Sequence, residues 1–300
     1  MLRSVSLLAL AVGLGLASPV LAADWQWEDS GMRDSYPDDW KLEEENPIAV
    51  EAGVRYWYSM GQHDMQVIGD TYSSRDTSHI IEGVLRVEEP ATGWYGKANG
   101  GYSAVISNDF TTPTRSMHLD SGEIRYWGGD VGWRALGNET LSSGGFLGYQ
   151  YWNDSPDMWR ENFTGGLQSV PNKLEYHMLR LGLTTKAVFG EHFEIEGEIA
   201  AVPYAMIKGQ YGAFVHPTYD PGVTPASPGN LSGWLYGATG EVMARFRPDE
   251  NWSIGLGGRA WYLTGQADFT FQSTANNWIT KTQQFSTFRY GLLGEVSYKF

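Results

Sequence analysis

The sequence ends with the stretch Tyr290-Gly-Leu-Leu-Gly-Glu-Val-Ser-Tyr-Lys-Phe300, which is its most informative stretch for the fold class. Because side chains alternate between the two faces of a strand, every second residue of this stretch falls on one apolar face, whereas Arg289 and Glu295 fall on the other. Such a strand is typical of a β-barrel in lipid, whose outer face meets acyl chains and whose inner face is polar. A strand of a soluble sandwich shows the same alternation, so other features must decide between the two folds.

The N-terminus indicates export. A short basic start, Met1-Leu-Arg3, precedes an apolar run from Leu7 to Leu16, and Ser18-Pro-Val-Leu-Ala22 ends in a small-residue cleavage site. We therefore predict a signal peptide over residues 1–22. No other segment approaches the length that a membrane-spanning helix needs. For a Gram-negative protein, export and the closing strand together predict location in the outer membrane.

Composition agrees with a barrel. Aromatic residues make up 14% of the chain, there are 37 glycines and no cysteine, and only 19% of residues are charged. Barrel walls use glycine where strands approach closely and aromatic residues at the membrane interfaces. The mean hydropathy of −0.35 is compatible with this fold, because only every second residue of a strand touches lipid. Without cysteine, no disulfide stabilises the exported protein.

About half of the net charge of −14 lies in one segment. Residues 24–46 carry nine acidic groups against Arg33 and Lys41, with no apolar period. We interpret residues 23–47 as an acidic periplasmic lead-in and residues 48–300 as the barrel. The alternative is a segment that binds a basic partner. So acidic a protein is a poor candidate for binding nucleic acid.

Alternating segments separated by long polar loops and short turns predict an all-β fold, a transmembrane up-and-down antiparallel β-barrel. The expected strands are 48–62, 77–88, 94–106, 122–136, 145–152, 174–187, 193–204, 234–247, 252–264 and 285–300. The long loops alternate strictly with short turns, which places all long loops at one end. Ten strands are expected, and because bacterial single-chain barrels have even strand numbers, eight or twelve are the alternatives.

Charged residues gather on the inward faces of these strands. The expected lumen network consists of Glu51, Glu82, Arg86, Lys97, Asp130, Arg134, Arg180, Glu194, Glu196, Glu198, Glu241, Arg245, Arg259, Arg289 and Glu295. Buried charges are costly unless paired, and both signs are present in similar numbers. We therefore predict an ion-paired, plugged lumen. A narrow charge-lined pore for small ions or solutes is the alternative.

No metal or cofactor site is predicted. The carboxylates of Glu194, Glu196 and Glu198 suit a hard cation such as calcium. However, they are strung along one strand, and arginine partners are available in the lumen. Glycine-rich phosphate loops, serine-centred elbows and paired Cys/His spacings are absent from the sequence.

The order of parts resembles the omptin barrel, a family of Gram-negative surface proteases. The resemblance rests on ten strands, five long outer loops, the segment Gly145 to Gln150 (GFLGYQ) and a long fourth loop. In omptins, two aspartates in the second loop and an Asp-x-His pair in the fourth activate a water molecule. The resemblance therefore implies an acid–base protease site at the barrel rim.

The residues of that apparatus are only partly matched. The fourth loop offers Phe214-Val-His216, so the histidine is present but Phe214 stands in place of the aspartate. The second loop offers Asp109 and His118-Leu-Asp120 without paired acids, and Asp220 substitutes only if its loop folds back. The catalytic candidates are thus His216, Asp109 and Asp220. We predict a shell that does not cleave, with an omptin-like hydrolase as the lesser alternative.

Several partners follow from these patterns. The closing strand looks like the C-terminal strand of bacterial outer-membrane barrels, in which a terminal aromatic residue is read by the barrel-assembly machinery. Tyr298 and Phe300 are the expected signal. Outer-membrane lipid and lipopolysaccharide would surround the barrel. Aromatic residues in the loops could bind an extracellular ligand or pack on one another. They are Tyr72, Phe110, Trp159, Phe163, Tyr211, Phe214, Tyr219, Phe269 and Trp278. The expected role is structural or surface interaction.

Overall fold

The computed structural model describes ten ranges of the chain between residues 48 and 300. These are residues 48–67, 70–111, 116–120, 122–138, 140–156, 168–169, 172–211, 214–215, 229–272 and 278–300. The predicted signal peptide, the predicted acidic segment and the candidates His216 and Asp220 lie outside the described residues.

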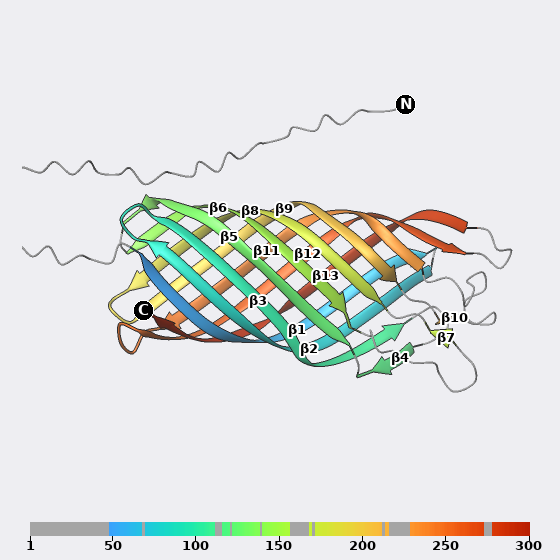
Figure 1. Ribbon diagram of the computed structural model, residues 1–300, viewed down its shortest axis with the longest axis horizontal. Coiled ribbons are helices and arrows are strands. Elements are labelled where there is room, and N and C mark those ends of the chain that lie inside the picture. The colour runs from blue at the N-terminus through green and yellow to red at the C-terminus, as the bar shows by residue number, and fades with distance from the viewer. Residues whose placement is uncertain are drawn as a thin grey trace, which may run out of the picture. The chain divides into compact units, whose positions relative to one another are not determined.

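A single sheet of long antiparallel strands curls into a closed barrel (Figure 1). Its ten strands are β1 (Ala49–Val67), β2 (Asp70–Glu89), β3 (Trp94–Thr111), β5 (Glu123–Gly137), β6 (Leu141–Ser155), β8 (Lys173–Phe189), β9 (Phe193–Tyr211), β11 (Gly229–Phe246), β12 (Trp252–Gln272) and β13 (Trp278–Lys299). Three short strands lie beyond them, β4 (Ser116–Leu119), β7 (Gln168–Ser169) and β10 (Phe214–Val215). β4 pairs with β3, and β7 pairs with β10.

The barrel closes where the first strand meets the last. β1 and β13 run antiparallel from the pair Glu51–Lys299 to the pair Met65–Phe285. Each of the other strands also pairs with its neighbour in the chain order of the ten. This arrangement confirms the predicted up-and-down barrel of ten strands. Closure removes the free edges that an open sheet exposes.

The two ends of the barrel differ. Short turns between β2 and β3, β5 and β6, β8 and β9, and β11 and β12 lie together with Phe300 at one end, which we call the turn end. Gly190 adopts a φ of 64° in the turn after β8, a conformation that glycine adopts without strain. The other end, the loop end, carries the longer connections between β3 and β5, β6 and β8, and β9 and β11, and also the two-residue connection between β1 and β2, where a long loop was predicted. In bacterial outer-membrane barrels, the turns are periplasmic and the loops extracellular.

The strands extend further toward the loop end than the sequence predicted. Residues 265–284, expected as a loop, are largely strand, because β12 runs to Gln272 and β13 begins at Trp278. The prediction ended strands where the outward face ceased to be apolar. At this height, however, outward residues such as Gln266 and Asp268 are polar and exposed while their neighbours stay buried. The strands therefore continue past the apolar band into water.

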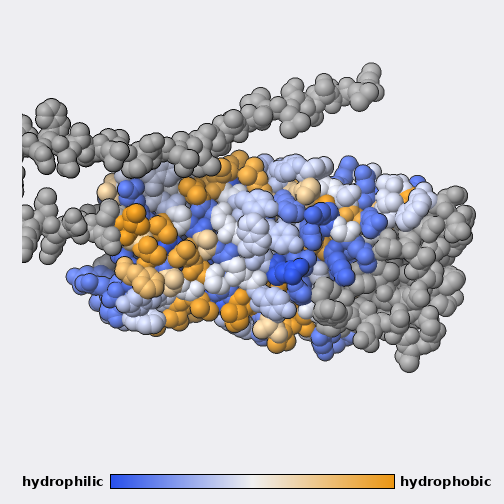
Figure 2. Space-filling model, in the orientation of Figure 1, coloured by the Kyte–Doolittle hydropathy of each residue, from blue (hydrophilic) through white to orange (hydrophobic). Residues whose placement is uncertain are grey.

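The outer surface is apolar toward the turn end and polar toward the loop end (Figure 2). Leu256 and Leu292 are 73% and 69% exposed on the apolar part, an exposure that a soluble protein would avoid. Tryptophan, tyrosine and phenylalanine flank this band. On the turn side they are Trp94, Trp133, Phe193, Phe246 and Trp252, and on the loop side Tyr58, Trp127, Tyr149, Tyr204, Trp234, Tyr262 and Phe288. Such a girdled band is the signature of a barrel in lipid.

A bulge changes one predicted face. The pairing of β2 with β3 shifts register between His79 and Ile80, opposite Ser103 and Val105. Beyond it, Ile106 is buried, although strict alternation from Trp94 had placed it outward. An extra residue in one strand reverses the side-chain parity that follows.

Two aromatic residues expected in loops belong to the interior instead. Phe110 is fully buried on β3 and Phe269 is 4% exposed on β12, whereas Trp278 is exposed, as predicted. Among the described residues, the structure contains no helix with the length and hydropathy that crossing a membrane requires.

Candidate functional site: the charged interior of the barrel

One continuous ion-pair network fills the interior nearer the turn end. Its acidic members are Glu51, Glu82, Glu88, Asp130, Glu194, Glu196, Glu198, Glu241 and Glu295. Its basic members are Arg55, Arg86, Lys97, Arg134, Arg180, Lys186, Arg245, Arg247 and Arg259. The two signs are equal in number, so the network has no net charge. Such balance offsets the cost of taking the charges out of water.

Arg55 lies at the centre of this network on β1. Its Nη1 is 3.1 Å from Glu82 Oε1 and 3.1 Å from Glu241 Oε1, and its Nε donates a hydrogen bond to Glu295. Arg259 reaches two of the same carboxylates from β12, at 2.8 Å to Glu82 Oε2 and 2.7 Å to Glu241 Oε2. The contacts of Arg55 with Glu241 and of Arg259 with Glu82 thereby join strands that do not pair with each other.

The three glutamates of β9 each have cationic partners. Arg245 Nη1 lies 2.9 Å from Glu194 Oε1 and 2.8 Å from Glu196 Oε2, and Lys97 Nζ lies 3.1 Å from Glu198 Oε2. Glu194 and Glu196 thus share Arg245 of the neighbouring strand β11, whereas Glu198 pairs with Lys97 of β3, which does not neighbour β9.

The structure places every residue of the predicted lumen network inside the barrel. All fifteen side chains are no more than 12% exposed. Sequence reasoning omitted Arg55, Glu88, Lys186 and Arg247 from this set. Arg55 shares the inward parity of Glu51, so alternation alone could have added it. Arg247 follows the last residue of β11, beyond the reach of a strand pattern.

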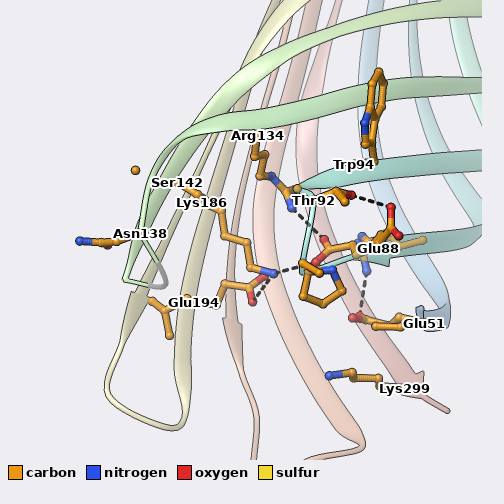
Figure 3. A pocket seen from close by; sticks show the side chains of 18 of the residues that line it. Glu51, Glu88, Thr92, Trp94, Arg134, Asn138, Ser142, Lys186, Glu194 and Lys299 are labelled. Atoms are coloured by element: carbon orange, nitrogen blue, oxygen red, sulfur yellow. Dashed lines mark hydrogen bonds and ion pairs between the residues drawn. The ribbon is translucent and has the colours of Figure 1, made fainter. Parts of the chain in front are cut away.

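A cavity of about 1100 Å³ opens at the turn end. Glu51, Glu88, Lys186 and Glu194 line it, and Figure 3 shows the Lys186 ammonium between the carboxylates of the two glutamates that it pairs with, Glu88 and Glu194. Deeper in the barrel, the space left beside Lys97 and Arg259 shrinks to about 20 Å³. A cavity of that size holds about one water molecule. We call the opening at the turn end the vestibule.

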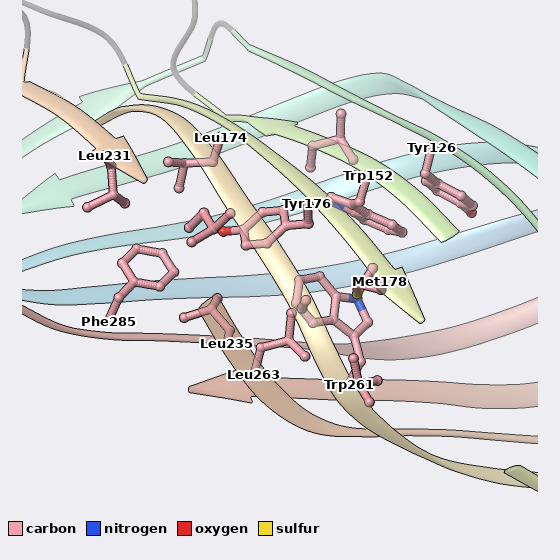
Figure 4. Close-up of a cluster of buried hydrophobic side chains, with 14 of the residues drawn as sticks. Tyr126, Trp152, Leu174, Tyr176, Met178, Leu231, Leu235, Trp261, Leu263 and Phe285 are labelled. Carbon is pink, nitrogen blue, oxygen red and sulfur yellow. The ribbon is translucent and has the colours of Figure 1, made fainter. Parts of the chain in front are cut away.

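An aromatic layer lies on the loop-end side of the ion-pair network. Tyr126 stacks on Trp152 with ring centres 4.2 Å apart, and Trp57 and Trp261 meet Trp152 edge-on at 5.8 and 5.5 Å. The Tyr126 hydroxyl donates a hydrogen bond of 2.6 Å to Glu82 Oε2, which joins this layer to the network below. Toward the loop end follows an apolar layer, part of which Figure 4 shows. It includes Leu174, Leu231, Leu235, Leu263 and Phe285.

A second buried polar cluster lies among these apolar groups. Arg289 on β13 binds Asp76 on β2 with both terminal nitrogens, at 2.8 and 2.9 Å, and reaches Asp154 Oδ2 on β6 at 2.9 Å. His63 Nε2 on β1 lies 3.1 Å from the same Asp154 oxygen. Arg289 was predicted to face inward. Its partners were missed, because they fall in segments expected to be loops, 63–76 and 153–172.

The second outer loop brings three predicted residues together. His118 Nδ1 on β4 lies 2.7 Å from Asp109 Oδ1 on β3, and its Nε2 lies 3.2 Å from Asp120 Oδ1. The hydrogen bond to Asp109 and the charge of Asp120 raise the pKa of His118 above its usual value. The group lies on the outer face, because the neighbouring Asn108 and Phe110 are the residues that point inward.

These features define a ten-stranded antiparallel barrel of the outer-membrane type, whose interior holds an ion-pair network. Among solved structures, the outer-membrane protease OmpT from Escherichia coli is similar, with a TM-score of 0.61 at 10% identity, covering 84% of this chain and 96% of that one. This likeness shows the fold, and it agrees with the ten-stranded layout inferred from the sequence.

Two further outer-membrane proteins are more distantly similar. The translocator domain of the autotransporter NalP from Neisseria meningitidis matches with a TM-score of 0.40 at 10% identity, covering 87% of this chain and 91% of that one. The toluene transporter TodX from Pseudomonas putida matches with a TM-score of 0.28 at 9% identity, covering 85% and 90%. No family model matches the sequence. No curated protein matches it either.

Proposed function

We propose that the protein is an integral outer-membrane barrel with a closed interior, which acts as a structural or surface-interaction protein. The observation that carries this proposal is the narrowing of the interior from a vestibule of about 1100 Å³ to a space of about 20 Å³ within a balanced ion-pair network. The girdled apolar band on the outside supports residence in lipid. Function then belongs to the surfaces at the two ends and not to the lumen.

Interaction through the outer loops is the finer part of this proposal. At the loop end the strands extend well beyond the apolar band, so that polar strand residues and the loops are exposed to water. The proposed partners are outer-membrane lipid and lipopolysaccharide around the band, an extracellular ligand at the loops, and the barrel-assembly machinery at the closing strand. Exposed aromatic groups such as Trp278, 60% exposed, suit a ligand contact.

A narrow channel is the second candidate, and the vestibule is the observation that favours it. The two readings differ in planar lipid bilayers, where single-channel conductance of the refolded protein is measured. A closed barrel gives no conductance steps, and Glu196→Gln leaves it silent, because the aromatic and apolar layers stay in place. Steady steps that change with Glu196→Gln would establish a charge-lined pore instead. An established porin inserted by the same procedure controls for insertion.

An omptin-like hydrolase remains the third candidate, resting on the similarity in layout and on the predicted residue His216. Peptide cleavage by the refolded protein, lost on His216→Ala, would establish it. The closed-barrel proposal expects no cleavage that depends on this residue.

A further inference from the structure

We propose that His63, Asp76 and Asp154 form a binding site for one divalent metal ion of the zinc class, buried in the loop-end half of the barrel. One ligand atom from each residue lies within 4.8 Å of the other two, and all three side chains are buried. They come from β1, β2 and β6. A bound ion would therefore join opposite walls of the barrel.

The charges in this cluster do not balance. Two carboxylates, Asp76 and Asp154, face one guanidinium, that of Arg289, and all three side chains are shielded from solvent. With a neutral imidazole, the cluster has one negative charge in excess. This contrasts with the network nearer the turn end, where both signs are equal. An uncompensated buried charge is costly, so the cluster attracts a further cation.

The geometry of His63 favours a metal ion over a direct ion pair. Its Nε2 is 3.1 Å from Asp154 Oδ2, yet this buried nitrogen makes no hydrogen bond among the described residues. The N–H bond or lone pair of His63 Nε2 is therefore not directed at Asp154 Oδ2. Two ligands of one zinc ion behave in this way, because both aim at the ion. With bonds of about 2.0–2.1 Å in a tetrahedron, the ligand atoms lie about 3.3 Å apart.

The surroundings match an outer shell of a metal site. His63 Nδ1 is 3.2 Å from the Tyr176 hydroxyl, a partner for the second ring nitrogen of the kind that orients a ligating histidine. Asp76 accepts hydrogen bonds from Ser78 at 2.5 Å and from Arg289, which hold its carboxylate in place.

The set of donor atoms selects the class of ion. One imidazole nitrogen and two carboxylates suit zinc, whereas calcium needs six to eight oxygens. Three protein ligands leave a fourth position open, as zinc sites with a bound water do. Zinc lowers the pKa of such a water, and a bound hydroxide would bring the cluster back to neutrality.

Zinc binding to the refolded full-length protein, prepared without a histidine tag, tests the site. Affinity is measured by competition with a chromophoric chelator, and the ligand set by the visible spectrum of the cobalt form. We expect one ion per barrel, with affinity lost in His63→Gln by more than the roughly 10–100-fold that an outer-shell loss costs. His118→Gln removes an exposed histidine that also contacts carboxylates, so it serves as the matched control and keeps full affinity.

Because His63→Gln could impair folding, Tyr176→Phe provides a second variant. It removes only the hydroxyl at Nδ1, and we expect it to weaken zinc binding by about 10-fold or more. Absence of stoichiometric zinc binding in the wild-type protein, or binding unchanged by both variants, overturns the proposal. The proposal is also overturned if the free energy of unfolding of the wild-type protein rises on acidification and does not change when zinc is added, since a proton on His63 then supplies the missing charge.

Discussion

Arg55→Met is the most direct test of the closed, balanced interior. The substitution keeps much of the side-chain volume but removes the cation that contacts Glu82, Glu241 and Glu295. The network, neutral in the wild-type protein, is left with one excess negative charge in a region without solvent. Removing one partner of a buried ion pair costs about 3–5 kcal/mol. This loss lowers the folding equilibrium constant by roughly 10²–10⁴-fold.

The assay is urea unfolding of the protein refolded into lipid vesicles, followed by tryptophan fluorescence and by the gel mobility of folded and unfolded barrel. The free energy of unfolding is extrapolated from the linear part of the transition. Lys208→Met is the matched control, because the exposed Lys208 pairs at 3.2 Å with Glu175, which is half-exposed. An exposed pair contributes only about 0–1 kcal/mol.

A double variant separates charge balance from lost packing. Adding Glu295→Gln to Arg55→Met removes one negative charge and restores neutrality. We expect the double variant to be more stable than the sum of the single losses predicts, by about 0.5–3 kcal/mol. Arg55→Met costing no more than Lys208→Met would refute the reasoning, since solvent or ions would then have to screen the interior.

Three further predictions concern other parts of the barrel. Leu256→Arg places a charge on the lipid face and lowers the free energy of unfolding in vesicles by about 2–4 kcal/mol; no loss would mean that this band does not contact acyl chains. Gly61→Ala brings a Cβ to 2.3 Å from Arg289 Nη2 and from Asp76 Oδ1, and costs about 1–3 kcal/mol by urea unfolding. Gly83→Ala, with no atom within 4 Å, is its near-neutral control. The His118 ring titrates above its usual pKa of 6.5 by NMR, and Asp109→Asn lowers that midpoint. The contact holding β4 to β3 is therefore fully present below pH 6.5 and is lost as pH rises through the raised pKa of His118. Identical midpoints in the two proteins would contradict this attribution.

The catalytic residues expected from the resemblance to omptins are only partly matched in this chain. The fold is shared with OmpT, but at 10% identity it does not bring the protease chemistry with it. In the second loop, the structure joins Asp109, His118 and Asp120 into one exposed group, with the imidazole held between two carboxylates. Such a group joins β4 to β3 through the contact between His118 and Asp109.

The sequence by itself determined the wall of the barrel. The period of two in side-chain direction is a local property of a strand, so the alternation from Tyr290 to Phe300 was enough to assign lipid and lumen faces. The same alternation in other strands placed Glu196, Arg245 and Arg259 inside. Turn residues and loop lengths then set the number of strands at ten. These inferences need only neighbouring residues, which is why they could be made without coordinates.

Only the tertiary structure decided which groups meet. Glu82 and Glu295 face Arg55 on its neighbouring strands, but its partner Glu241 and the partners of Arg289 lie on strands that do not pair with theirs, at distances set by the stagger of the closed sheet. The bulge before Ile106 reversed a face that strict alternation had assigned. His63, Asp76 and Asp154 were hidden in presumed loops, because strands above the lipid lose their apolar outer face and with it the signal that reveals them. Pairing between distant strands has no local pattern, so the partner of each charge in the predicted ion-paired lumen could be recognised only in the closed barrel.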